Sequence, residues 1–305
     1  MGRWNRSEIW RDIKRDRWLY LFLAPAFILL FIFCYIPIYG VVIAFQDFSG
    51  LYGIFSSPWV GLKHFYAILK DPSIVTVFSN TVIIGVLIIL FGFPAPILLS
   101  LFFNEIGSKS FKRVSQSFSY LPYFISTVVI VGMMKEFLSM DGIVNMFVKA
   151  LGGLPVNFIN DPGWFRSIYV VSDIWQGVGW GSILYLASIS GIPEELYEAG
   201  TIDGASRLKK IAYITIPSLM PVISIQFILA MGGILGASFE KIILLYSPAT
   251  YSTADVISTY VYRIGLQGAN YSYGSAVGLL NSIISFFFVY ASNRFIRKAN
   301  GYSFW

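Results

Sequence analysis

The sequence predicts an all-α membrane protein that crosses the bilayer with six helices. The chain of 305 residues is 56% hydrophobic and only 12% charged, with a mean hydropathy of +0.68. A soluble globular domain carries about a quarter charged residues, so this composition excludes that class. The sequence also contains six apolar stretches, almost free of charge, of roughly 20 residues or more, the length of a spanning helix. A third observation, the one-sided placement of the basic residues, gives the orientation.

The expected elements follow these stretches in chain order. The predicted membrane-spanning helices cover residues 18–44, 74–104, 114–134, 168–190, 211–239 and 272–293. Residues 1–17 alternate Trp4 and other apolar side chains with basic ones, which predicts a short amphipathic helix on the membrane surface; a disordered tail is the alternative. Residues 191–210 form a charged loop between the fourth and fifth spans, and residues 294–305 form a short basic tail.

Proline occurs inside several of the predicted spans. Pro25 and Pro37 lie in the first span, Pro94 and Pro96 in the second, and Pro217 near the start of the fifth. Membrane helices tolerate proline with a kink because neighbouring groups satisfy the backbone atoms that proline leaves unpaired. These residues therefore predict bends and remove none of the spans.

The basic residues concentrate in alternate connections. They gather before the first span, between the second and third, between the fourth and fifth, and after the sixth. The positive-inside rule then places both termini and the loop 191–210 in the cytoplasm of a cell whose plasma membrane the chain crosses repeatedly. This placement explains the net charge of +6 through contact with membrane lipid, without nucleic acid as a partner. The first apolar run is too long for the hydrophobic region of a cleaved signal peptide.

The sequence offers no set of residues for catalysis or for holding a metal. His64 is the single histidine and has no cysteine or carboxylate cluster near it, so no metal site is expected. The pattern G-x-x-x-x-G-K-[ST], which holds ATP phosphates, does not occur. Asp173 is the lone acid near a membrane interior and has no evident partner, while Glu240 and Lys241 are expected to be solvated at the outer interface. A transport subunit powered from outside is favoured over an enzyme or a proton-coupled carrier.

The fourth span carries side chains suited to a sugar pathway. Trp175, Gln176 and Trp180 offer aromatic faces and an amide, and a sugar ring presents C–H surface and hydroxyl groups together. An interfacial aromatic belt or packing against lipid explains the tryptophans equally well, and both interpretations stay open. The glycines at 177, 179 and 181 favour close helix approach over nucleotide binding, because the dinucleotide-binding glycine run needs a preceding strand.

The loop from Gly191 to Pro221 is the one segment that is both charged and highly patterned. Pro193 suits the first position of a helix, and Glu194 and Glu195 in the first turn complement the helix dipole. Asp203-Gly204 predicts a break before a second short helix, which carries basic residues. We therefore expect a water-facing helix–turn–helix that re-enters the bilayer near residue 211.

The spacing within this loop resembles that of a known family. Glu198-Ala199-Gly200, three residues, Gly204, nine residues, Ile214, one residue and Ile216-Pro217 resembles the EAA loop of ABC-importer permeases. Gly200 stands where the family has a second Ala, and Ile216 stands where it has Leu. Longer stretches, among them VSDIWQGVGWGSILYLASISGIPEELYEAGTIDGA, look like the LplB-type permeases of the carbohydrate group, alongside the maltose-type MalF.

This resemblance implies a type I ABC importer permease (MetI-like) fold and a set of partners. The chain would pair with a second, homologous permease to form a heterodimer, together with two ATP-binding-cassette subunits. An extracytoplasmic solute-binding protein would deliver an oligosaccharide, derived from a polysaccharide or otherwise complex. ATP and Mg²⁺ would be bound by the ATPase subunits, so this chain would need no cofactor and would not itself be an enzyme. Alternating access across a bacterial cell membrane would be driven by ATP hydrolysis in the partners.

The resemblance also assigns candidate site residues. The coupling helix that contacts the ATPase subunit would use Glu198, Ala199, Gly200, Asp203, Gly204 and Ala205. The substrate pathway would include Trp175, Gln176, Trp180, Ser238 and Asn281, with Trp180 near the position of a sugar-contacting aromatic in the maltose system. Two alternatives stay open, namely an ABC permease for a peptide or another solute and, more distantly, a membrane enzyme or carrier outside the ABC class.

Overall fold

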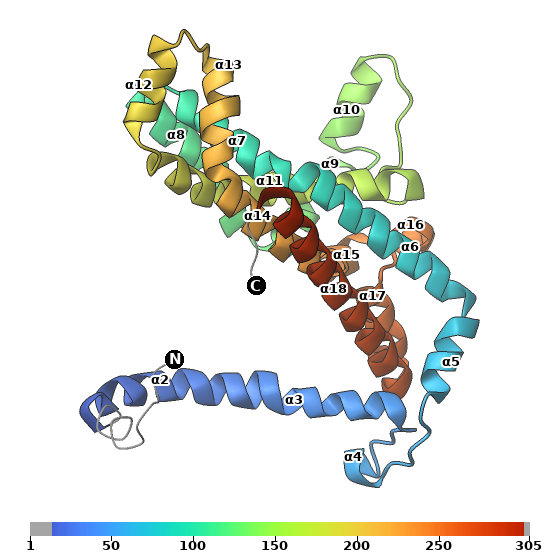
Figure 1. Ribbon diagram of the computed structural model, residues 1–305. Helices are drawn as coiled ribbons and strands as arrows, with labels where there is room; N and C mark the ends of the chain where they lie inside the picture. Colours follow the sequence, from blue (N-terminus) through green and yellow to red (C-terminus); the bar gives the residue numbers. More distant parts are fainter. Residues whose placement is uncertain (1–13, 302–305) are drawn as a thin grey trace.

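The described part of the chain is a bundle of helices with one long helical rod set apart from it (Figure 1). The computed structural model describes residues 14–301, so most of the expected amphipathic segment 1–17 and the end of the basic tail lie outside it. Within the described residues there is no named strand, and one isolated bridge pairs Gln46 with Trp59.

The rod is the first predicted span. It comprises α2 (Arg17–Leu30), a π-helical turn (Phe31–Tyr35), α3 (Ile36–Ile38) and a 3₁₀ segment (Tyr39–Phe45). None of its most apolar 18-residue window is buried within this chain. Only its 3₁₀ segment packs into the body, where Ala44 joins a cluster with Tyr273 and Val277. Because such apolar surface is unfavourable in water, the rod needs lipid or another protein around it.

Four long helical units form the body. They are α6 (Pro72–Leu87) continued through a π-helical turn (Ile88–Gly92) into α7 (Pro94–Glu105), then α11 (Pro162–Ser190), α14 (Ile216–Gly232) and α18 (Tyr271–Asn300). Helix α11 packs along α7, and α14 packs along α18. The largest core cluster includes Ile84, Tyr169 and Ile242 and so joins α6 and α11 to a later short helix.

Two stretches that the sequence predicts as continuous spans are interrupted in the structure. Residues 114–134 fall across α8 (Lys109–Tyr120), a 3₁₀ turn (Leu121–Phe124) and α9 (Thr127–Phe137), and the two arms meet at 97°. Pro122 and the N-cap residue Ser126 explain the bend, because proline removes a helical hydrogen bond and the cap starts a new helix. Within 211–239, α14 ends at Gly232 and α15 (Phe239–Leu245) begins only after a non-helical stretch rich in glycine.

The number of segments that can cross a membrane agrees broadly with the six expected. Four of the described helical segments are long and apolar enough, namely Arg17–Phe45, Pro72–Glu105, Arg207–Gly232 and Tyr271–Lys298. The bent pair α8–α9 would be a fifth. With 29 residues, α11 is also long enough at about 1.5 Å per residue, although its polar and small side chains make it less apolar.

The shorter elements lie at the ends of the bundle and along its side. They are α4 (Gly53–Ser56), α5 (Lys63–Lys70), α10 (Ile143–Ala150), α12 (Glu194–Ile202), α13 (Arg207–Lys210) with a π-helical turn (Ile211–Thr215), a 3₁₀ turn (Pro248–Thr250), α16 (Tyr251–Ala254) and α17 (Ile257–Tyr260) with a π-helical segment (Val261–Gln267). Figure 1 shows α8, α12 and α13 together at one end and α4 and α5 at the opposite end.

A carboxylate at the α5 end ties α6 to later parts of the chain. Asp71 caps α6 by accepting the backbone N–H of Ser73 at 2.9 Å, and it accepts the hydroxyl groups of Tyr260 and of Tyr273, the latter at 2.9 Å. Burial alone raises the pKa of Asp71, but these hydrogen bonds outweigh burial and hold the pKa below its usual value. The carboxylate therefore stays ionised and keeps the ends of α6, α17 and α18 together.

Candidate functional site

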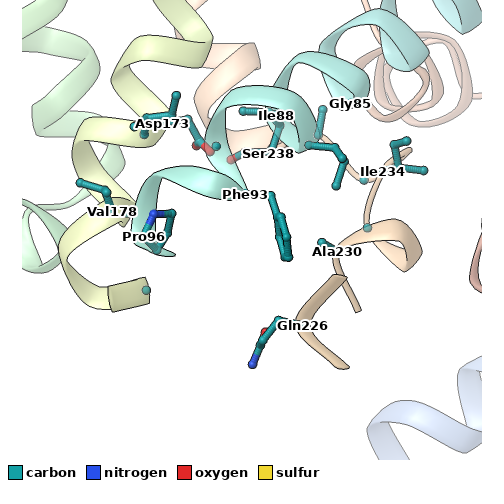
Figure 2. A pocket seen from close by; sticks show the side chains of 18 of the residues that line it. Gly85, Ile88, Phe93, Pro96, Asp173, Val178, Gln226, Ala230, Ile234 and Ser238 are labelled. Atoms are coloured by element: carbon teal, nitrogen blue, oxygen red, sulfur yellow. The ribbon is translucent and has the colours of Figure 1, made fainter. Parts of the chain in front are cut away.

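A cavity of about 690 Å³ opens among α6, α7, α11 and α14 and is the first of two candidate sites (Figure 2). Most of its wall is apolar, with polar groups from Asp173, Gln226 and Ser238 and the aromatic side chains of Tyr169 and Trp180. Figure 2 shows Asp173 and Ser238 near one end of the cavity and Gln226 near the other. An apolar pocket with a few polar groups is the usual form of a site for a small molecule.

The break between α14 and α15 supplies one wall of this cavity. Residues 233–238 are not helical, and Gly233, Gly236 and Ser238 face the cavity. A Cβ atom on Gly85 would lie 2.1 Å from the backbone oxygen of Ile234, so only glycine lets α6 approach the break this closely. Irregular backbone at membrane depth is tolerated where it is buried in protein or lines a cavity, and transporters often bind solute at such interrupted helices.

A buried ion pair holds the break against α11. The Lys241 Nζ atom donates to Asp173 Oδ1 at 2.9 Å, and the lysine side chain is 2% exposed while the aspartate is 37% exposed. Ser238 starts α15 as its N-cap, and its own backbone N–H donates to the Tyr169 hydroxyl at 2.9 Å. The expectations that Asp173 lacks a partner and that Lys241 is solvated beside Glu240 are therefore wrong. The partner lies 68 residues away along the chain, so the charges close to Asp173 in the sequence could not indicate it.

The five sequence-predicted pathway residues do not all come together. Trp180 and Ser238 line the cavity, whereas Trp175 lines a second, almost wholly apolar cavity of about 620 Å³ between α9, α10 and α11. Gln176 points to the connection between α8 and α9 and donates to the Ile125 carbonyl at 3.3 Å. Asn281 lies on α18, lines neither of these cavities, and its side-chain oxygen is buried without a hydrogen-bond partner among the described residues.

Trp180 forms part of an aromatic group at the cavity wall. Its ring stacks on that of Tyr123 with centroids 4.7 Å apart and planes 4° apart, and Phe124 meets it edge-on at 5.9 Å. The polar lining residue Gln226 was not predicted, although a lone amide within an uncharged span is a signal that could have identified it.

The loop between α11 and α14 is the second candidate site. Its first helix α12 ends at Ile202, and Gly204 then adopts a left-handed conformation with φ +71°. Such a conformation is easy for glycine and costly for other residues. The turn is closed by the Ala205 N–H, which donates to the Gly200 carbonyl at 2.8 Å. Ser206 then caps α13 through the backbone N–H of Lys209.

Four of the six predicted coupling residues are exposed and two are turned inward. Glu198, Ala199, Asp203 and Gly204 are exposed, whereas Gly200 and Ala205 are half-buried. A Cβ atom on Gly200 would lie 3.1 Å from Ile214 Cδ1, so this glycine lets α12 pack against the start of the next long helix.

Two large apolar side chains on this loop were missed by the sequence interpretation. Ile202 is 86% exposed and Leu208 is 78% exposed, and they flank the Gly204 turn. Isoleucine and leucine projecting from a charged loop are a signal for a binding surface. Among the described residues there is no cluster of three or more His, Cys, Asp or Glu side chains that could hold a metal ion.

Comparison with known proteins gives relatives along most of the chain. Residues 92–298 match the family model described as binding-protein-dependent transport system inner membrane component. Protein LplB of Bacillus subtilis (strain 168) is 37% identical over 287 residues, which cover 94% of this chain and 90% of the relative. The polygalacturonan/rhamnogalacturonan transport system permease protein YteP of the same organism is 37% identical over 295 residues, which cover 96% and 92%.

Solved structures agree with this assignment. The chain is similar to one from a bacterial ABC transporter involved in the import of the acidic polysaccharide alginate, with a TM-score of 0.89 and 42% identity over 95% of this chain and 99% of that chain. A second structure of a bacterial alginate ABC transporter, in complex with a periplasmic protein bound to an alginate pentasaccharide, gives a TM-score of 0.89 and 41% identity over 96% and 99%. The chain belongs to the family of binding-protein-dependent transport system inner membrane components.

Proposed function

We propose that this chain is one permease subunit of an ATP-driven importer that takes up an oligosaccharide. The observation that carries the proposal is similarity along nearly the whole chain to permeases named for saccharide transport, YteP and the alginate transporter. In this proposal a second permease completes the pathway, two ATPase subunits bind ATP and Mg²⁺, and an extracytoplasmic binding protein delivers the solute. The concentration of basic residues in alternate connections supports a cytoplasmic position for both termini and the loop 191–210.

The cavity supports a saccharide as the transported solute. Trp180 presents an aromatic face for C–H surface, and Asp173 and Gln226 supply groups that hydrogen-bond to hydroxyls. Asp173 Oδ1 is occupied by Lys241, and the carboxylate is the more exposed partner of the pair, so it can also accept from a solute hydroxyl. In this proposal Trp180, Ser238 and Asp173 belong to the pathway, while Trp175, Gln176 and Asn281 act outside this cavity.

The loop supports ATP-driven coupling. Glu198, Asp203 and the Gly204 turn form a polar exposed surface, and Ile202 and Leu208 add apolar side chains that an ATPase cleft could bury. Burying a large apolar side chain contributes about 1.5–3 kcal/mol, so these two side chains would be the main anchors of the docked loop.

Uptake by proteoliposomes that contain the complete complex tests the proposal. Labelled neutral oligosaccharides, acidic oligosaccharides and peptides are offered with the binding protein, with and without ATP. We expect ATP-dependent accumulation of a saccharide. Accumulation of peptides alone would leave the family assignment in place and remove the saccharide, and uptake without any ATPase subunit would contradict the proposal as a whole.

Trp180→Ala is expected to change the handling of solute without changing assembly. Removal of the indole takes away its stacking against the solute. At the strength of an aromatic pair this is worth about 0.5–1.5 kcal/mol, or about two- to thirteenfold in a rate or affinity. The measurement is the uptake rate for a series of saccharides at saturating loaded binding protein. Trp175→Ala is a matched control, because both tryptophans are 46% exposed and lie on α11 but only Trp180 lines this cavity. Equal effects of the two substitutions would contradict the assignment of Trp180.

A further inference from the structure

We propose that Tyr197 and Thr215 are positioning residues that fasten α12 to the start of α14, so that displacement of the loop reaches the cavity. The inference rests on the proposed coupling role of the loop and adds the contact through which that coupling passes. The two hydroxyl groups are hydrogen-bonded with 2.9 Å between their oxygen atoms, and either can donate. Thr215 is 1% exposed and Tyr197 is half-buried, so this bond is partly shielded from water.

A second chain of contacts runs beside the first. The Lys210 Nζ atom donates to Thr201 Oγ1 at 2.7 Å, and Thr201 Oγ1 donates to the Tyr197 carbonyl at 2.7 Å. Gly200 adds close packing against Ile214. Together these contacts join one face of α12 to residues 210–215, which lead directly into α14.

The position of α12 depends on these contacts because the helix has no core of its own. None of its nine residues is buried. A helix with an apolar core is held by many dispersed contacts, whereas α12 is held by few, and single substitutions can remove the polar ones. The hydroxyl pair is therefore the contact whose loss should separate the loop from the bundle.

The pair also lies beside an irregular part of the following helix. Thr215 ends a π-helical turn, and Pro217 and Pro221 follow it in α14. Proline has no N–H, so the Tyr213 carbonyl loses its α-helical partner and the helix can bend there. A hydrogen bond from Tyr197 at this point makes the start of α14 follow the loop. Gln226 and Ala230, farther along α14, line the cavity and would move with it.

The test measures solute molecules imported per ATP hydrolysed by the complete complex in proteoliposomes. Tyr197→Phe and Thr215→Val each remove one hydroxyl with little change in volume. We expect each to lower this ratio about threefold or more, the effect of losing one partly buried hydrogen bond. The double variant should be no worse than the poorer single variant, because both remove the same bond. Thr215→Ser keeps the hydroxyl and should keep the wild-type ratio.

Tyr213→Phe is the matched control. Tyr213 lies in the same segment, is 78% exposed and makes no side-chain hydrogen bond among the described residues, so its substitution should leave the ratio unchanged. A wild-type ratio for Tyr197→Phe, multiplicative losses in the double variant, or an equal loss in Thr215→Ser and Thr215→Val would each overturn the inference. If Glu198→Lys and Gly204→Arg also import normally, the proposed coupling role of the whole loop is wrong. If those two variants uncouple transport but Tyr197→Phe and Thr215→Val do not, only the proposed role of the Tyr197–Thr215 hydrogen bond is wrong.

Discussion

Glu198→Lys and Gly204→Arg are each expected to reduce coupled uptake by at least about tenfold, which corresponds to about 1.4 kcal/mol, while the chain still inserts and assembles. Glu198 is exposed on α12, so a reversed charge changes the surface offered to the ATPase and not the packing of the bundle. Gly204 has φ +71°, a conformation that costs a residue with a Cβ atom about 1–2 kcal/mol, so arginine should displace the turn. Uptake and ATP hydrolysis are measured in parallel on the purified complex.

Two variants control for nonspecific effects on the loop. Glu195→Lys reverses a charge on the same exposed helix but outside the motif, and it should retain most uptake. Gly204→Asn introduces a residue that tolerates the left-handed conformation better than arginine does, so it should lose less uptake activity than Gly204→Arg. Normal uptake by both Glu198→Lys and Gly204→Arg would refute the coupling assignment.

Asp173→Ala is expected to destabilise the protein by about 3 kcal/mol, the low end of the usual cost of leaving one member of a buried ion pair unpaired. Lys241 is 2% exposed, so without the carboxylate its ammonium group has no counter-charge in the site. The low end applies because Asp173 is 37% exposed and water reaches it. The measurement is thermal or denaturant-induced unfolding of the purified complex. Adding Lys241→Met removes the unpaired ammonium group and should recover part of the lost free energy of unfolding.

The pair between Asp141 and Lys149 is the matched control for this experiment. Its charged atoms are 3.7 Å apart, and the side chains are 97% and 47% exposed. Asp141→Ala should change the free energy of unfolding by no more than about 1 kcal/mol, as is usual for exposed pairs. Equal effects of Asp173→Ala and Asp141→Ala, or a double variant at Asp173 and Lys241 that is less stable than either single one, would show that the buried pair does not hold the break in place.

The helical class and the family were predictable because they depend on features that are local in the sequence. Length and low charge set the number of spans, and fixed gaps between Glu198, Gly204 and Pro217 identified the loop. The family match over residues 92–298 confirms the predicted family. The bend at Pro122 was not predicted, although a proline inside an apolar stretch is a local signal for a kink.

The grouping of pathway residues could have been improved by helical geometry alone. Trp175 and Trp180 are five residues apart, and at about 100° per residue they project about 140° apart around α11. This separation predicts different surroundings for the two side chains, and the structure places them in different cavities. Asp173, Gly177 and Leu184 share the spacing of a single helix face and do line one cavity.

Contacts between distant parts of the chain could not be predicted from the sequence. Asp173 meets Lys241 beside the break between α14 and α15, and Gly85 lets α6 pack closely against that break. The bond between Tyr197 and Thr215 likewise depends on the angle at which α12 returns to α14. Neither of these two contacts is encoded by a local pattern in the sequence.

The most direct test of the central claim is the ATPase activity of the reconstituted complex, measured with the binding protein loaded in turn by different solutes. We predict that one class of oligosaccharide stimulates ATP hydrolysis several-fold over the unloaded binding protein, and that Glu198→Lys abolishes this stimulation. Stimulation by peptides or other solutes, and by no saccharide, would contradict the assignment of this chain to oligosaccharide import.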